Sequence, residues 1–332
     1  MSHSDTSKHL VKKLDDLDGQ LAHALQIDGR ASFATLAAVM GVSDQTVARR
    51  YARLRADRTL RVLGLTDPSA TGEAQWYLRL RTTPDTAQSI AAALARRLDT
   101  SWVMLLGGGT EITCTVRAPW AGNDLLLSTL PRTGRVLEVQ AHCRLHQYYG
   151  GRRGAVEKLG ALRPEQVQAL TPTMTPISAA LADPSIDAVD RQILDQLSVD
   201  GRMRIEQVSA AVSAPSATVR RRLERLRANG TLYFDVELDN RLLRGEAETV
   251  LWLKTEPSDL QAVGEALASH PQITFAAACT GPYAIIAHAL CPDPGSLYRY
   301  LTTSIAALPG LREVTSAPVI RLIKGPGPYP LG

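Results

Sequence analysis

Two stretches of the sequence, 49–61 and 220–227, are dense in arginine. The first contains Arg49, Arg50, Arg53, Arg55, Arg58 and Arg61, and with Asp44 and Asp57 nearby, six minus two leaves a local charge of +4. The second contains Arg220, Arg221, Arg222, Arg225 and Arg227 against Glu224, and five minus one again leaves +4. A guanidinium can hydrogen-bond two acceptors at once, which suits guanine edges and phosphates. Both stretches therefore predict contacts with double-stranded DNA, although a solvated helical face would carry the same charge.

The composition of the whole chain is that of an ordinary folded protein. Apolar residues make up 45% of its 332 residues and charged residues 21%, which suits two to four compact domains. The formal net charge of +4 is small for this length, so only the local clusters indicate a polyanionic partner. No apolar run approaches the roughly 18 residues of a membrane span, and residues 1–10 lack the apolar core of a signal peptide. We therefore expect a cytoplasmic location and no membrane partner.

The sequence contains a long internal repeat that includes both arginine stretches. Asp28-Gly29-Arg30 recurs as Asp200-Gly201-Arg202, and the offset of 172 (200 minus 28) holds without a gap from Leu17 to Leu60. Further on, Gly72-Glu73-Ala74 recurs as Gly245-Glu246-Ala247. Repetition on this scale predicts two complete copies of a two-domain unit.

The first part of each copy has the pattern of three short helices. Apolar residues recur at helical spacing at Leu14, Leu17, Leu21 and Leu25, and again at Val47, Tyr51 and Leu54. Ser32 and Ser43 are suitable N-caps, and Gly41 can adopt the left-handed conformation of a tight turn. These signals predict helix-turn-helix domains at 11–66 and 183–240, with the arginines on and just after the third helix.

The expected DNA contacts follow from the geometry of this motif, in which the N-terminal half of the third helix meets base edges. We assign base reading to Gln45, Thr46 and Arg49, and to Ala217, Thr218 and Arg221. Arg53, Arg220 and Arg225 are expected to contact phosphates. Ser43 and Ser216, at the starts of the two helices, are also expected to be DNA-binding residues. Arg50 and Arg222 lie beside the apolar stripe, so each could instead pair with Asp18 or Asp190 of the first helix.

The second part of each copy, at 72–149 and 245–325, alternates strand and helix patterns in the order strand, helix, strand, strand, helix, strand. This order predicts a ferredoxin-like βαββαβ domain, an antiparallel sheet with both helices on one face. In the first copy the expected helices run from Pro84 to Arg97 and from Asn123 to Leu130. A linker at 150–182, with a short helix from Pro164 to Leu170, joins the copies. The predicted fold class is α+β, with two winged or helix-turn-helix three-helix DNA-binding domains alternating with two ferredoxin-like domains.

An Asp-Gly-Arg after the first helix, a Thr-Val-x-x-Arg third helix and a following ferredoxin-like domain resemble the Lrp/AsnC, or leucine-responsive, family of transcriptional regulators. Each of the two copies shows this resemblance, and together they make up nearly the whole chain. It implies that sheets pack face to face in dimers that assemble further, and that amino acids or related metabolites bind near a glycine turn. The matching residues are Gly108, Gly109 and Thr110, and Gly281, Pro282 and Tyr283. The acidic residue that often follows is replaced by Ile112 and Ala284, and a glycine in a hairpin turn needs no ligand to explain it.

The resemblance implies a metabolite-responsive DNA-binding regulator rather than an enzyme. In such a regulator we expect the fused copies to form an intramolecular pseudo-dimer on an asymmetric operator. We also expect homo-oligomers of these pseudo-dimers. Two alternatives remain at this point. Siroheme decarboxylases resemble the same architecture and are also found fused in pairs, and a third possibility is a metabolite-binding module without DNA binding.

The cysteines and histidines give no sign of a metal site. Cys114, Cys143, Cys279 and Cys291 are scattered without a Cys-x-x-Cys pair, so we expect reduced core residues. His142, Cys143 and His146 are close in sequence, but side chains alternate along a strand, so Cys143 would face away from both histidines. We expect neither a metal nor another cofactor.

Overall fold

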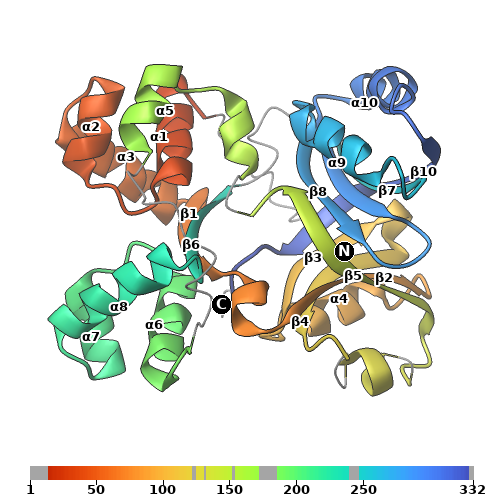
Figure 1. Ribbon diagram of the computed structural model, residues 1–332, viewed down its shortest axis with the longest axis horizontal. Coiled ribbons are helices and arrows are strands. Elements are labelled where there is room, and N and C mark those ends of the chain that lie inside the picture. The colour runs from red at the N-terminus through yellow and green to blue at the C-terminus, as the bar shows by residue number, and fades with distance from the viewer. Residues whose placement is uncertain are drawn as a thin grey trace, which may run out of the picture.

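The computed structural model describes residues 14–121, 125–130, 132–151, 154–171, 185–238 and 247–328. It places two helical units beside a closed β-barrel, with a two-stranded sheet between the helical units (Figure 1). Of the predicted domains and linker, residues 11–13, 122–124, 131, 152–153, 172–184, 239–240 and 245–246 lie outside the described residues. In the part of the chain that is described, no helix has the length and apolarity needed to cross a membrane.

Each helical unit has the three predicted helices. The first contains α1 (Asp16–Ile27), α2 (Phe33–Met40) and α3 (Asp44–Ala56), and the second α6 (Ala188–Val199), α7 (Ile205–Val212) and α8 (Ser216–Ala228). The predicted caps are confirmed, because Ser32 and Ser43 accept hydrogen bonds from the amides of Thr35 and Thr46. Gly41 has a φ of 70°, and its counterpart Ser213 adopts the same left-handed conformation with a φ of 52°. The turn is therefore kept in both copies despite the change of residue.

A strand follows the third helix of each unit and was not predicted. β1 (Leu60–Thr66) pairs antiparallel with β6 (Leu232–Leu238), with Leu60 opposite Leu238 and Gly64 opposite Phe234. The two strands join the helical units across 172 residues of sequence. A β-carbon on Gly64 would lie 2.8 Å from Cβ of Leu197, so only glycine permits this approach of the second unit.

The Asp-Gly-Arg segments bind one another across this junction. The Arg30 guanidinium donates to the carbonyls of Gly201 and Met203 at 2.7 and 3.1 Å. The Arg202 guanidinium returns the contact at the carbonyls of Gly29 and Ala31, at 2.8 and 2.9 Å. We call these four bonds the arginine exchange.

Aromatic rings support both guanidiniums, with Arg202 4.9 Å from the ring centroid of Phe33 and Arg30 5.8 Å from that of Phe234. The exchange also needs the glycines. A β-carbon on Gly201 would lie 2.8 Å from the carbonyl carbon of Leu63, and one on Gly29 would lie 2.7 Å from Cβ of Phe234. The repeated motif is therefore a docking element between the copies.

The α+β parts have the predicted element order. The first contains β2 (Ala74–Thr82), α4 (Ala87–Ala95), β3 (Thr100–Leu106), β4 (Glu111–Ala118) and β5 (Val136–Tyr149). The second contains β7 (Ala247–Thr255), α9 (Leu260–Ser269), β8 (Ile273–Cys279), β9 (Ile285–Cys291), α10 (Pro294–Tyr300) and β10 (Leu311–Lys324). Of the helix expected over 123–130, a single π-helical turn (Leu125–Thr129) is described, and 122–124 lie outside the described residues. The four buried cysteines are free thiols.

The two four-stranded sheets close into one barrel with the strand order β10-β3-β4-β2-β5-β8-β9-β7. The ends of β5 and β10 extend beyond their own sheets and pair with β8 and β3 of the other copy. Between the sheets lies a shared core that contains Tyr77, Met104, Trp252, Ala277 and Ile286. Because the sheets join at both edges, no strand of the barrel, as far as the chain is described, has an open edge with which a further chain could pair.

The predicted linker is partly folded into the first helical unit. The short helix α5 (Pro164–Leu170) has the bounds expected from the sequence. However, Leu162 and Leu170 are buried in the core of the helical units, and the Gln166 amide donates to the Val39 carbonyl at 2.6 Å. Residues 162–170 of the predicted linker at 150–182 therefore pack against the helical units.

The arginine exchange gives a first testable prediction. Replacing Arg202 by Met removes the donors of two carbonyls, and both carbonyls belong to buried residues, Gly29 and Ala31. We expect the free energy of unfolding to fall by about 2–4 kcal/mol, the cost of two unsatisfied acceptors. Urea unfolding followed by circular dichroism measures it. Arg191→Met, at an exposed position of α6, is the matched control, and equal stability of the two variants would contradict the role given to Arg202.

Candidate nucleic-acid interface and ligand cavity

The residues assigned to base reading lie on the outer faces of α3 and α8. Gln45, Arg49, Ala217 and Arg221 are exposed, and Thr46 and Thr218 are half-buried at equivalent positions. Among the described residues, Arg49 and Arg221 have no carboxylate partner, so both guanidiniums face solvent. Arg220 is likewise exposed, while Ser216 is half-buried at the first position of α8. Ser43 is occupied with capping α3, and its hydroxyl also lies 2.8 Å from that of Thr46.

Arg50 and Arg53 form ion pairs with the first helix. The Arg50 guanidinium lies 2.6 Å from the Asp15 carboxylate and 2.8 Å from that of Asp18, and Arg53 lies 2.6 Å from Asp18. Asp18 is only 2% exposed, so its ion pairs with Arg50 and Arg53 hold α3 against α1. Of the two roles that the sequence left open for Arg50, the structure shows the internal pairing.

The second copy repeats the arrangement. Arg222 lies 2.6 Å from Asp187 and 3.0 Å from Asp190, and Arg225 also contacts the fully buried Asp190. The amide of Asp190, followed by the Arg222 guanidinium, lowers the pKa of the Asp187 carboxyl. Four of the arginines counted in the sequence thus neutralise carboxylates of the first helices, and the charge facing outward is smaller than the local +4 of each stretch.

The C-terminal ends of α3 and α8, which we call the recognition helices, contact the opposite copy. Arg55 of α3 lies 2.8 Å from Asp200, and Arg227 of α8 lies 3.4 Å from Asp28. These pairs join each third helix to the other copy's Asp-Gly-Arg segment. The two recognition helices are therefore held in one fixed arrangement by the arginine exchange, the β1–β6 pair and these ion pairs.

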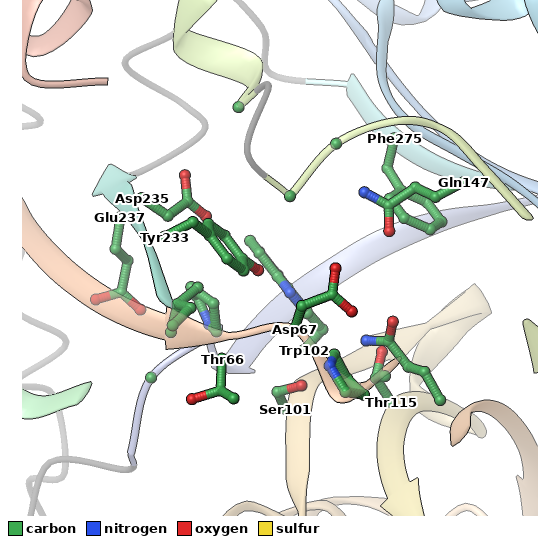
Figure 2. A pocket seen from close by; sticks show the side chains of 18 of the residues that line it. Thr66, Asp67, Ser101, Trp102, Thr115, Gln147, Tyr233, Asp235, Glu237 and Phe275 are labelled. Atoms are coloured by element: carbon green, nitrogen blue, oxygen red, sulfur yellow. The ribbon is translucent and has the colours of Figure 1, made fainter. Parts of the chain in front are cut away.

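A cavity of about 720 Å³ lies between the β1–β6 pair and the barrel (Figure 2). It is lined by equivalent positions of the two copies, for example Trp102 and Phe275 (275 minus 102 is 173) or Thr115 and His288 (again 173). Burial raises the pKa of the lining residue Asp235 to about 7 and lowers that of His288 to about 4. Sequence reasoning did not find this site, because its residues come from all ten described strands, β1 to β10, and share no local pattern.

The predicted glycine turns are both present, at the ends of strands. Gly107–Gly109 have φ values of 51°, 78° and 83°, and the Thr110 hydroxyl reaches the Gly107 carbonyl at 3.5 Å. Gly281 has a φ of 99°, and a β-carbon there would lie 2.6 Å from Nδ1 of His142. That nitrogen is 2.9 Å from the Thr280 carbonyl. Close packing of His142 thus explains Gly281 without a ligand.

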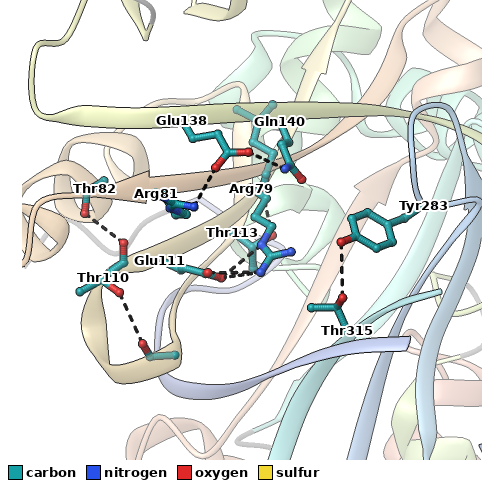
Figure 3. A network of polar contacts seen from close by, with 12 residues as sticks. Arg79, Arg81, Thr82, Thr110, Glu111, Thr113, Glu138, Gln140, Tyr283 and Thr315 are labelled. Atoms are coloured by element: carbon teal, nitrogen blue, oxygen red, sulfur yellow. Dashed lines mark hydrogen bonds and ion pairs between the residues drawn. The ribbon is translucent and has the colours of Figure 1, made fainter. Parts of the chain in front are cut away.

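Polar side chains surround these turns inside the barrel (Figure 3). Arg79 stacks 4.0 Å from the ring centroid of Trp252 and lies 3.1 Å from the Glu111 carboxylate. The Tyr283 hydroxyl is 3.4 Å from that of Thr315. Two buried atoms in this region, Nε2 of His142 and Oε1 of Gln140, have no hydrogen-bond partner among the described residues. Buried polar atoms of this kind are ordinarily satisfied by a partner, a water or a ligand.

The described residues contain no cluster of three or more metal-ligating side chains. His142 and Cys143 are both buried, whereas His146 is exposed. A ring nitrogen of His142 lies 2.9 Å from the Thr280 carbonyl, and the Cys143 amide donates to the Thr280 hydroxyl at 2.8 Å.

Comparison with known proteins identifies both domain types. The AsnC-type helix-turn-helix model matches residues 14–55 and 186–227, and the Lrp/AsnC ligand-binding domain model matches residues 248–328. Two uncharacterized HTH-type transcriptional regulators, from Pyrococcus abyssi and Pyrococcus horikoshii, are each 29% identical over 133 residues, 40% of this chain and 84% of theirs.

Among solved structures, the siroheme decarboxylase NirDL resembles the whole chain. It covers 95% of this chain and 94% of its own at 11% identity with a TM-score of 0.63. Its co-complex with an iron-uroporphyrin III analogue gives 12% identity and a TM-score of 0.62. This likeness shows that the tandem arrangement is a known fold. With its two AsnC-type helix-turn-helix domains and its Lrp/AsnC ligand-binding domain, the chain is a tandem member of the Lrp/AsnC family.

Proposed function

We propose that this protein is a sequence-specific DNA-binding transcriptional regulator that acts as an intramolecular pseudo-dimer. One observation carries the proposal: the arginine exchange fixes two helix-turn-helix units against each other while Arg49 and Arg221 stay exposed. A fixed pair of recognition helices suits two half-sites at a set spacing on one duplex.

The proposed base contacts differ between the copies. Gln45, Thr46 and Arg49 would read one half-site, and Ala217, Thr218 and Arg221 the other. Gln45 can hydrogen-bond an adenine edge, whereas Ala217 can only contact a thymine methyl group. The proposed operator is therefore asymmetric, unlike the near-palindrome that two identical units would read.

The arginines that pair with the first helices retain a role in phosphate binding in this proposal. Their side chains are 35% exposed for Arg53 and 47% for Arg225, and a guanidinium has five donors. Each can therefore hold its aspartate and a phosphate together. Arg50 and Arg222 are less exposed and would orient the recognition helices, and Arg220 would contact a phosphate directly.

We further propose that a small-molecule effector of the amino-acid class binds at the glycine turns, at Gly108, Gly109 and Thr110 or at Gly281, Pro282 and Tyr283. The unsatisfied buried Nε2 of His142, whose ring packs against Gly281 of the second turn, supports this site. Assembly into homo-oligomers of pseudo-dimers belongs to the same proposal. Exposed apolar side chains such as Trp120, Leu137 and Ile320 are consistent with further contacts between chains.

The whole-chain likeness to NirDL makes siroheme decarboxylation the second candidate. Its substrate is a tetrapyrrole rimmed by carboxylates, which needs a cationic pocket. The cavity has the opposite balance: Asp67, Asp195, Asp235, Glu237 and Glu248 line it against Arg117, Arg144 and Lys324. This charge distribution favours the regulator over the enzyme.

DNA binding is tested by removing both proposed guanine contacts. We expect Arg49→Ala combined with Arg221→Ala to weaken binding to a DNA selected by the purified protein by roughly 30-fold or more, since each bidentate contact is worth about 1–3 kcal/mol. Fluorescence anisotropy at fixed salt measures the dissociation constant. Arg321→Ala, an exposed arginine of β10, is the control. Equal affinities of the double variant and the control would refute the base-reading assignment.

The enzymatic candidate is tested with siroheme itself. We expect titration with siroheme under reducing, oxygen-free conditions to leave the tetrapyrrole absorption spectrum unchanged, because the cavity carries more carboxyl groups than cations. A saturable spectral shift with decarboxylated product detected by mass spectrometry would reverse the order of the two candidates.

A further inference from the structure

The cavity between the β1–β6 pair and the barrel has the properties of a built ligand site. Its volume of about 720 Å³ lies within the range of small-molecule pockets. Figure 2 shows Trp102, Asp67 and Tyr233 gathered around one space, with Phe275 and Gln147 on its far side. The glycine turns do not line this cavity, so it is separate from the effector site proposed above.

Aromatic rings form much of the wall. Trp102, Tyr233 and Phe275 line the cavity, and the buried Tyr77 reaches it from inside the barrel, with its ring centroid 5.5 Å from that of Phe275. Trp102 has a φ of 50°, an unfavourable conformation for a bulky residue. It occurs where the β3–β4 pairing shifts register, and the Trp102 amide donates to the Gly325 carbonyl at 3.1 Å. Backbone strain of this kind clusters at ligand sites.

The charges of the wall favour a cation. Five carboxyl groups and three basic side chains line the cavity. Each basic side chain has a protein partner, Glu237 is paired with Arg61, and burial raises the pKa of Asp235 to about 7. Arg144 lies 3.7 Å from Asp67, Lys324 donates to the Arg97 carbonyl at 2.6 Å, and Arg117 donates to the Leu98 carbonyl at 3.4 Å. Aromatic faces attract cations through their quadrupoles, and that attraction adds to the effect of the carboxylates.

Exposed leucines belong to the lining of the cavity. Leu98 and Leu145 belong to its lining and are 83% and 57% exposed. Exposed leucines beside an aromatic and acidic interior fit a ligand with a cationic head and an apolar or aromatic body. An amino-acid zwitterion would instead place its carboxylate against a wall that already has an excess of carboxyl groups.

We propose that this cavity binds a small organic cation, an amine with an aromatic or alkyl body, and that its occupancy alters DNA binding. One wall, which includes residues 64–68 of the β1 region and residues 233 and 235–238 of β6, belongs to the strands that join the helix-turn-helix units. The other wall is the barrel. A ligand wedged between them changes the position of the strand pair and, with it, that of both recognition helices. The regulatory part rests on the proposed function, whereas the binding part does not.

The binding part is tested on the full chain with three probes of equal body and different charge: tyramine, 4-ethylphenol and 3-(4-hydroxyphenyl)propionate. Isothermal titration calorimetry should show tyramine binding roughly tenfold more tightly than 4-ethylphenol, with the propionate weakest. Asp67→Asn should weaken tyramine binding about fivefold or more, and Trp102→Gly, which relieves the strained backbone, should weaken it similarly. Asp57→Asn, at an exposed position, is the control. Circular dichroism verifies that each variant is folded.

Equal affinity for the three probes, absence of binding by all of them, or tyramine binding unaffected by both cavity variants would overturn the site. The regulatory part is measured separately, as the dissociation constant for selected DNA with and without saturating tyramine, and a shift of at least about threefold is expected. Tyramine binding with unchanged DNA affinity would refute the regulation but leave the site. Tyramine binding by a protein without DNA affinity would instead refute the proposed function.

Discussion

Two guanidinium groups, each hydrogen-bonded to backbone carbonyls of the other copy, hold the two helical units of this molecule together. Arg30 and Arg202 satisfy carbonyls that would otherwise be left without donors at the junction, and Gly29 and Gly201 permit the close approach. The β1–β6 pair continues the same junction. Because each copy completes the other, the two helix-turn-helix units form one structural unit, and a duplicated sequence becomes a single asymmetric molecule.

This junction also determines where a ligand could act. The barrel is closed at both edges by exchange of the ends of β5 and β10, so its two sheets cannot separate without breaking strand pairs. The β1–β6 pair has only two strands and faces a cavity on its barrel side. It lies directly between the proposed ligand and the helix-turn-helix units.

Local signals predicted the local structure well, as shown by the caps Ser32 and Ser43, the turn at Gly41 and the bounds of α5. Contacts across the copies left no such signal. The pattern around Arg50 indicated a possible pairing with Asp18, but Arg53, one helical turn later, reaches the same carboxylate and had been assigned to phosphate. The Asp-Gly-Arg motif indicated the repeat, but nothing in the sequence indicated that each of its two occurrences binds the other. The cavity combines residues more than 100 positions apart, for which periodicity has no information.

The proposal that α3 and α8 form a fixed, asymmetric pair of DNA-contacting helices is tested most directly by hydroxyl-radical footprinting. Two single variants are compared on one selected DNA fragment. If the account is right, Arg49→Ala loses protection over one half-site and Arg221→Ala over the other, while the spacing between the protected regions stays the same. Loss of the same protected region in both variants, or full protection in each, would contradict the central claim that one chain reads two different half-sites.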